Sequence, residues 1–127
     1  MLKATESQIH TAICQYIKLQ YPNIIFTSES GGMFTSPGLA NRIKKQRSGT
    51  GLPDLIILEP RNGYHGLCIE LKSSPACLYK KDGTLKKSLH LIAQNEILER
   101  LRSLGYFSTF AVSFEGCKLI IDEYLSK

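Results

Sequence analysis

The segment 49–72 constrains the fold of this chain more than any other part of the sequence. It contains two short apolar runs, 55–58 and 67–71, with the residues Arg-Asn-Gly at 61–63 between them. Apolar runs of this length are typical of strands, and Asn-Gly favours a tight turn. The segment therefore predicts two strands joined as a β-hairpin.

Ionisable side chains stand at the ends of these runs. Asp54 opens the first run, and Glu70 and Lys72 close the second. Because side chains alternate along a strand, Glu70 and Lys72 lie on one face, with Leu71 on the other. Hairpin pairing brings Asp54 near Glu70 at one edge of the sheet. Two carboxylates and an ammonium group there can hold a divalent metal and a phosphate. The alternative is a salt bridge at the strand end between Lys72 and one of the acids.

The chemistry of this set suits a hard cation. Magnesium prefers oxygen ligands and usually keeps several waters. Asp54, Glu70 and the backbone carbonyl of Leu71 can supply part of its coordination shell. Lys72 can orient or help to deprotonate an attacking water, or neutralise charge in a transition state. The three histidines lack the spacing of a zinc site, and no glycine-rich phosphate loop is present.

Composition sets broader limits. A length of 127 residues with 43% apolar content predicts one globular domain, residues 1–127. The sequence has neither an apolar run long enough to span a membrane nor a signal-peptide core, so we expect a cytoplasmic protein. A net charge of +5 and an isoelectric point near 9.1 favour a polyanionic partner, although a solvated basic face is an equally good reading of charge alone.

Lysine and arginine residues cluster in two polar segments, 29–48 and 73–87. Loops rich in lysine and arginine commonly contact phosphates, and the first of these segments leads directly into Asp54. The second, at 73–87, is long for a connection within a compact domain, as binding loops and lids often are. The predicted nucleic-acid contacts are Arg42, Lys44, Lys45, Arg47, Lys80, Lys81, Lys86 and Lys87.

The remaining periodicity completes an order of helix, three strands, helix, strand and helix. Thr5 and Gln8 form a capping-box pattern, and Ser88 is a helix-capping residue. Gly116 is expected to break the last strand before the final helix. The predicted elements are a helix at 6–19, a strand at 24–27, the hairpin strands, a helix from Ser88 to about 104, a strand at 106–114 and a helix at 118–125.

Polar residues fall on the apolar faces of the first two helices. Glu6 lies three residues before Ile9 and so begins the inward-facing stripe of the first helix. Its simpler role is to complement the helix dipole as a first-turn acid. Gln94 interrupts the apolar face of the second helix, with His90 one turn earlier on the same side.

These residues resemble a known nuclease signature. Gly51-Leu52-Pro53-Asp54 followed by Glu70-Leu71-Lys72 is similar to the motif of the PD-(D/E)xK superfamily. More narrowly, residues 63–72, together with Gln94 and the Leu-Gly-Tyr sequence at 104–106, resemble the VRR-NUC family of virus-type replication and repair nucleases. The resemblance covers about residues 6–125 and implies an α/β fold with a mixed sheet flanked by helices.

The resemblance also implies an activity, namely magnesium- or manganese-dependent hydrolysis of phosphodiester bonds in DNA. In it, Asp54 and Glu70 match the metal ligands and Lys72 the catalytic lysine. Glu6 matches the acid on the first helix, and Gln94 the glutamine that reaches the site from the second. A virus-type nuclease is compatible with a phage-encoded protein that acts in a bacterial host cell.

Small stand-alone members of the family are similar to Holliday-junction resolvases and act as homodimers, as two cuts in a two-fold junction require. The main alternative is a nucleic-acid-binding module on the same fold that has lost catalysis. Others are a flap or duplex nuclease and a sequence-specific restriction-type enzyme, although the chain leaves little room for base-reading elements. The segment 30–41 lies outside the resemblance, so the preferred DNA structure stays open.

Overall fold

The computed structural model describes residues 4–28, 38, 42 and 51–126. Its elements are α1 (Glu6–Gln20), β1 (Phe26–Ser28), β2 (Leu55–Ile57), β3 (Leu67–Lys72), the 3-10 helix η1 (Pro75–Cys77), α3 (Leu89–Ser103), β4 (Phe107–Val112) and α4 (Ser113–Leu125). Within the described residues this is the predicted order, with η1 added after β3. No helix in these parts of the chain is long and apolar enough to cross a membrane.

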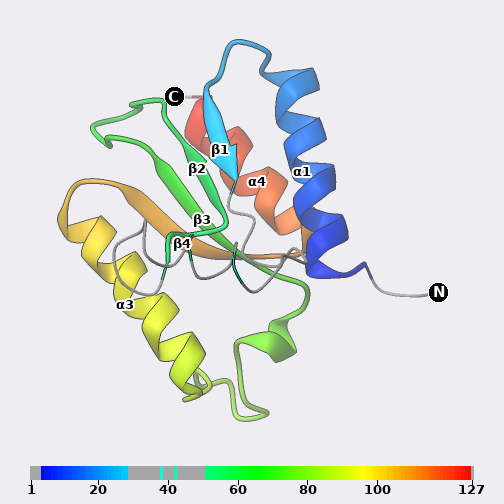
Figure 1. The fold of residues 1–127 in the computed structure, drawn as a ribbon, viewed down its shortest axis with the longest axis vertical. Helices are drawn as coiled ribbons and strands as arrows, with labels where there is room; N and C mark the ends of the chain where they lie inside the picture. The colour runs from blue at the N-terminus through cyan, green and yellow to red at the C-terminus, as the bar shows by residue number, and fades with distance from the viewer. Residues whose placement is uncertain (1–3, 29–37, 39–41, 43–50, 127) are drawn as a thin grey trace.

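The strands form a four-stranded mixed sheet in the order β1-β2-β3-β4 (Figure 1). β1 and β2 are antiparallel, β2 and β3 are antiparallel, and β3 and β4 are parallel. Parallel neighbours need a crossover connection, which α3 supplies between β3 and β4. This mixed sheet flanked by helices confirms the fold class predicted from the sequence.

The turn of the central hairpin forms where the sequence predicts it. Arg61 and Tyr64 exchange backbone hydrogen bonds of 3.2 and 2.8 Å. Asn62 and Gly63 between them have φ values of 51° and 86°. A two-residue turn with positive φ at both positions matches the twist of antiparallel strands, and asparagine and glycine tolerate that conformation best. The turn fixes the register of β2 against β3.

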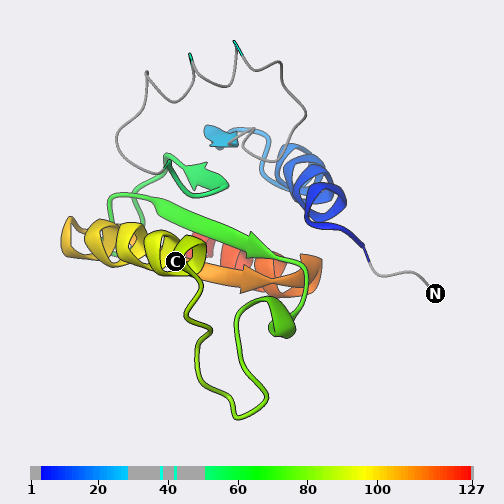
Figure 2. The same cartoon turned by 60° about the horizontal axis from the view of Figure 1, so that its bottom comes forward.

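Helices cover both faces of the sheet (Figures 1 and 2). On one face, Leu67, Ile69 and Leu71 of β3 belong to the core cluster that also contains residues of α1 and α4. On the other face, Glu70 and Lys72 lie toward α3. β3 is buried along its whole length, as its largely apolar sequence requires. One face of β3 therefore serves the core, and the other carries polar groups.

Helix α1 begins at the predicted capping box. The Thr5 hydroxyl accepts a hydrogen bond from the Gln8 backbone, and the Gln8 side chain accepts one from the Thr5 backbone, at 3.1 and 2.9 Å. Ile9, Ile13 and Ile17 are buried and form the stripe that packs into the core. The cap and the stripe together fix both the start of α1 and the face that it turns to the sheet.

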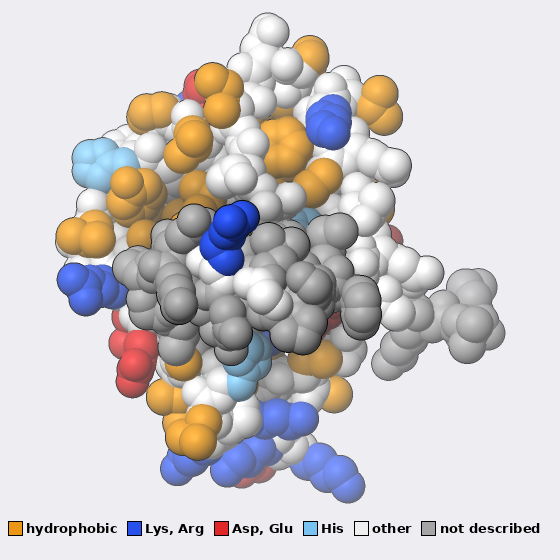
Figure 3. All heavy atoms as spheres, in the orientation of Figure 1, with side chains coloured by type: hydrophobic (Ala, Val, Ile, Leu, Met, Phe, Trp, Pro, Cys, Tyr) orange, Lys and Arg blue, Asp and Glu red, His pale blue; other side chains and the backbone are white. Residues whose placement is uncertain are grey.

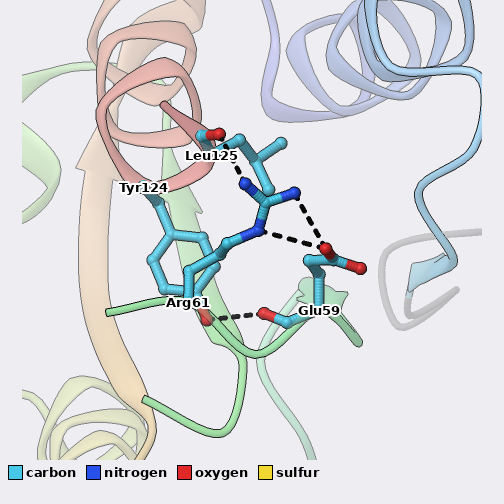
Figure 4. A network of polar contacts seen from close by, with 4 residues as sticks. All are labelled: Glu59, Arg61, Tyr124 and Leu125. Carbon is cyan, nitrogen blue, oxygen red and sulfur yellow. Dashed lines mark hydrogen bonds and ion pairs between the residues drawn. The ribbon is translucent and has the colours of Figure 1, made fainter. Parts of the chain in front are cut away.

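The C-terminal turn of α4 is tied to the turn end of the central hairpin (Figure 4). The Arg61 guanidinium donates hydrogen bonds to the Glu59 carboxylate at 2.8 and 3.0 Å and to the Leu125 carbonyl at 3.0 Å. The Tyr124 hydroxyl donates to the backbone carbonyl of Glu59 at 2.7 Å. Two of these bonds are donated to main-chain carbonyls. They hold the hairpin against α4 more firmly than the partly exposed ion pair between Arg61 and Glu59 would alone.

The junction between β4 and α4 differs from the prediction. The strand ends at Val112 and α4 begins at Ser113, so Phe114 and Gly116 lie inside a helix that was expected to begin at Lys118. Ser113 has φ 65° and makes the turn in a single residue. Its hydroxyl accepts a hydrogen bond from the backbone N–H of Gly116 at 3.3 Å.

The prediction failed because tertiary packing outweighs local propensity here. Glycine costs about 1 kcal/mol relative to alanine in a helix interior. Cys117, Ile121 and Leu125 recur at a spacing of four residues and are all buried in the core cluster. Burial of one such side chain contributes about 1.5–3 kcal/mol, so the apolar face of α4 offsets the glycine.

Replacement of Gly116 tests this assignment. A Cβ built at Gly116 meets only the Ser113 Oγ, at an ordinary 3.7 Å. Gly116→Ala should therefore stabilise the protein by about 0.5–1 kcal/mol in urea unfolding. Gly66→Ala is the control, since its Cβ would lie 2.8 Å from the Ile57 carbonyl oxygen and should destabilise. Destabilisation by Gly116→Ala would mean that α4 begins after this residue.

Candidate active site

Glu70 and Lys72 lie at the carboxyl end of β3, on the face that α3 covers. Each residue is only 8% exposed. Burial of an ionisable group is costly unless partners with good geometry compensate for the lost water. A strand end that buries two such side chains side by side therefore has to supply those partners.

Asp54 reaches the same place from the neighbouring strand. It immediately precedes β2, whose first residue Leu55 pairs with Ile69. Its Oδ2 atom accepts a hydrogen bond of 2.8 Å from the backbone N–H of Leu71. This bond fixes the Asp54 carboxylate beside Glu70, and the hairpin thus joins the two acids at one edge of the sheet.

Gln94 connects the two buried groups of β3. Its side-chain oxygen accepts a hydrogen bond of 2.9 Å from the Lys72 ammonium. Its side-chain nitrogen donates one of 2.9 Å to Oε1 of Glu70. Among the described residues, Lys72 makes no direct ion pair with either acid, so the alternative of a simple strand-end salt bridge is wrong.

The surroundings favour the protonated form of Glu70. Burial raises the pKa of Glu70 to about 9, and Asp54 adds to the rise through a hydrogen bond and through its negative charge. The Lys72 ammonium opposes the rise, and the charge of Glu6 adds to it. Glu70 therefore keeps its proton at neutral pH when no cation is bound beside it. A divalent cation would replace that proton.

The donor set fits a magnesium or manganese ion. Asp54 and Glu70 each offer a second oxygen besides the one bound by Leu71 or Gln94. The part of the chain that the structure describes contains no cluster of three histidine, cysteine or acidic side chains that could hold a metal. The protein would thus supply two carboxylates and the Leu71 carbonyl, and waters or a phosphate would complete the shell, as magnesium prefers.

Contrary to the prediction from periodicity, Glu6 does not belong to the buried stripe of α1. The buried stripe of α1 begins at Ile9, and Glu6 is exposed in the first turn. No hydrogen bond within the described residues links Glu6 to Asp54, Glu70 or Lys72. Its negative charge nevertheless adds to the rise in the pKa of Glu70. His90 is exposed and takes no part in the set.

The predicted phosphate contacts divide into two groups. Lys44, Lys45 and Arg47 lie outside the described residues, and Arg42 is described and exposed. The remaining four are exposed on the segment between β3 and α3: Lys80, Lys81, Lys86 and Lys87. In Figure 3 basic side chains gather at the lower end of the molecule, over this segment.

One functional contact was absent from the sequence prediction. The backbone N–H of Leu71 holds the Asp54 carboxylate, whereas only the Leu71 carbonyl was expected to take part. Every residue except proline carries such a donor, so residue identity gives no signal for it. Only the register of β2 against β3 reveals it.

Comparisons with known proteins agree with this geometry. No family model matches the sequence, and no curated protein matches it. A solved structure described as a VRR_NUC domain protein superimposes with a TM-score of 0.69 and 26% identity, covering 99% of this chain and 92% of that chain. This chain has the VRR-NUC fold. The resemblance seen in the sequence is thereby confirmed, and it extends over nearly the full length of both proteins.

The fold provides the contacts that hold Asp54 and Glu70 at the buried end of β3. A cluster of buried carboxyl groups beside a lysine is unfavourable unless the fold enforces it, and such clusters are typical of functional sites. Here β3 holds Glu70 and Lys72, the strand pairing holds Asp54, and α3 holds Gln94. The site thus depends on three separate elements of the fold.

The raised pKa of Glu70 predicts a pH dependence of stability. The folded-state pKa of about 9 exceeds the ordinary value of 4.5, so the folded protein binds more protons than the unfolded one between these values. In metal-free buffer the free energy of unfolding should therefore fall as pH rises through this window. Glu70→Gln keeps an oxygen acceptor for Gln94 and removes the titrating group. The melting temperature of this variant minus that of the wild type should therefore increase by roughly several degrees from about pH 5 to 9.

Thermal melts of both proteins across this range, with EDTA present, provide the measurement. The difference between the two melting temperatures isolates Glu70 from other titrating groups. Parallel curves for the two proteins would show that Glu70 ionises normally in the folded state.

Proposed function

We propose that this protein is a metal-dependent endonuclease that hydrolyses phosphodiester bonds in branched DNA, in the manner of a Holliday-junction resolvase. The observation that supports this most strongly is the hydrogen-bonded set of Asp54, Glu70, Lys72 and Gln94 at the end of β3, in a VRR-NUC fold. A DNA substrate also agrees with the cytoplasmic location expected from the sequence.

Asp54, Glu70 and the backbone carbonyl of Leu71 would hold a magnesium or manganese ion. A bound divalent ion supplies Lewis-acid activation of a phosphate and of water. Glu70 would have to lose its proton to serve as a ligand, so affinity for the ion should increase with pH.

Lys72 would act on the attacking water and on the phosphate. An ammonium group has three donors, and Gln94 occupies one of them. Within the described residues the other two have no partner, and they could hold a water or a phosphate oxygen and neutralise negative charge in the transition state. In hydrolysis the water oxygen bonds to phosphorus, the ester P–O bond breaks, and a proton of the water passes to the leaving oxygen.

Gln94 serves as a positioning residue in this scheme. It binds Lys72 through its oxygen and Glu70 through its nitrogen, so it fixes the orientation of both. Glu6 acts at longer range through its negative charge, near the position where a cation would bind.

The main alternative is a catalytically inactive DNA-binding module on the same fold. A module without catalysis has no need for a buried lysine beside two acids, and burial of this set costs stability. The presence of this set, held by hydrogen bonds from Gln94 and from the Leu71 backbone, favours the enzyme.

Recognition of DNA would rest on charge rather than on base edges. The exposed lysines lie on the segment that connects β3 to α3, and they suit contacts with phosphates. A homodimer is part of the proposal, because the two-fold symmetry of a four-way junction calls for two symmetrically placed sites.

End-labelled four-way junction, flap and linear duplex, each with magnesium, manganese or EDTA, test the proposal. Paired, metal-dependent nicks in the junction alone support a dimeric resolvase. Cleavage of flaps or duplex would support a nuclease whose substrate is not a four-way junction. Tight binding without cleavage under either metal would favour the inactive binding module.

Single substitutions test the assigned roles. Asp54→Asn and Lys72→Ala should each lower cleavage by at least about a hundredfold, because each removes a group that acts in the transition state. Glu96→Gln on α3 is the control, since this exposed acid makes no hydrogen bond to the site. Circular dichroism verifies folding. Full activity in Asp54→Asn would exclude it as a metal ligand.

The phosphate contacts are testable through salt dependence. The double variant Lys86→Gln, Lys87→Gln should weaken binding of all duplex sequences equally and lower the slope of log K against log salt by about 2, one for each lost phosphate contact. Lys18→Gln, an exposed lysine on α1, is the control. Fluorescence anisotropy at several salt concentrations measures the slope. An unchanged slope in the double variant would place the DNA elsewhere.

A further inference from the structure

The segment between η1 and α3 folds into a small hairpin, which we call the basic hairpin (residues 78–87). Its arms are joined by backbone hydrogen bonds of 2.7 Å from Lys86 to Leu78 and 2.8 Å from Lys80 to Thr84. Asp82 caps the turn by accepting hydrogen bonds from the backbone and hydroxyl of Thr84. A loop of this length is thus given a defined shape by its own hydrogen bonds.

The basic hairpin is attached to the active site at both ends. It follows β3, which ends at Lys72, and it leads into α3, which carries Gln94 (Figures 1 and 2). Leu78 at its base is only 2% exposed and anchors it to the protein. Beyond this anchor the hairpin extends away from the sheet, as Figure 2 shows. The basic hairpin thus joins the two elements that carry Lys72 and Gln94.

Tyr79 is the aromatic residue of this hairpin, and much of its side chain is exposed to solvent. It is 46% exposed. Its hydroxyl makes no hydrogen bond to any residue that the structure describes. The backbone of Tyr79 is fixed by a hydrogen bond of 2.9 Å to the Pro75 carbonyl and by pairing with Leu85. The backbone that carries the exposed ring is thus held by hydrogen bonds, and Lys80 and Lys81 follow it directly in the sequence.

We propose that Tyr79 stacks on an unpaired DNA base next to the cleavage site, while the neighbouring lysines bind the adjoining phosphates. An aromatic ring among basic residues is the arrangement by which proteins bind single-stranded nucleic acid. This inference rests on the nuclease function proposed above and specifies its substrate as DNA in which a base next to a duplex is unpaired, as in a flap, a fork or an open junction.

The ring and the lysines contribute differently to this recognition. Lysines bind phosphates of paired and unpaired DNA alike, so they give affinity without selectivity for structure. A fully paired duplex offers no free base face along its length. A branched DNA exposes one where strands diverge, and only there can Tyr79 add binding energy. Tyr79 is therefore the residue that would distinguish branched from linear DNA.

The test compares Tyr79→Leu with Tyr79→Phe, because leucine keeps apolar bulk without the ring and phenylalanine keeps the ring without the hydroxyl. The probe is a flap DNA with 2-aminopurine as the unpaired base at the branch, with a matched linear duplex alongside. Binding is measured in EDTA, so that no cleavage occurs. Stacking quenches the 2-aminopurine fluorescence.

Wild type and Tyr79→Phe should quench the probe and bind the flap roughly tenfold more tightly than Tyr79→Leu, whereas all three should bind the duplex equally. Equal flap binding by all three proteins, or an equal loss on flap and duplex, overturns the inference. Cleavage with magnesium or manganese is assayed separately. Wild type that stacks the base but cuts no DNA would overturn the nuclease function alone, and cutting without any effect of Tyr79 would overturn only the stacking.

Discussion

The two hydrogen bonds of Gln94 are the interaction on which the site depends. They place an amide between a buried ammonium and a buried carboxyl group, so that neither Lys72 nor Glu70 lacks a partner. Without them, the polar face of β3 would carry two ionisable groups in a low-dielectric environment, at a cost of several kcal/mol. The same two hydrogen bonds therefore dock α3 on the sheet and hold the ionisable groups of the site in place.

The alternation of side chains along β3 separates stability from function. Leu67, Ile69 and Leu71 pack into the core with α1 and α4, while Glu70 and Lys72 face α3. Because this period is two, a slip of one residue would exchange the faces and place the acids in the core. The tight turn at Asn62 and Gly63 and the tie between Arg61 and the end of α4 both oppose such a slip.

Much of this arrangement could be predicted from the sequence because it follows from local rules. The capping box at Thr5, the Asn-Gly turn and the period of β3 each specify their structure over a few residues. Periodicity showed only that Gln94 interrupts the apolar face of its helix. That Gln94 reaches the site was implied by the resemblance to VRR-NUC proteins.

What the sequence did not predict depends on tertiary contacts. Gly116 indicates a break by its propensity, but the burial of Cys117 and Ile121 extends α4 through it. The first strand was placed at 24–27 and lies at Phe26–Ser28, since pairing with β2 sets its ends. Glu6 matched the helical stripe and is nevertheless exposed, because burial of α1 begins one turn later. The basic hairpin has no sequence period, and its shape comes from its own hydrogen bonds.

The central claim is that Asp54 and Glu70 together bind a divalent ion, and direct titration with manganese tests it most directly. Electron paramagnetic resonance of free manganese, recorded near pH 8 without DNA, measures the bound fraction. The account predicts that the wild type binds manganese, that Asp54→Asn and Glu70→Gln each lose this binding, and that Glu96→Gln keeps it. Equal binding by all four proteins would contradict the assignment of the site.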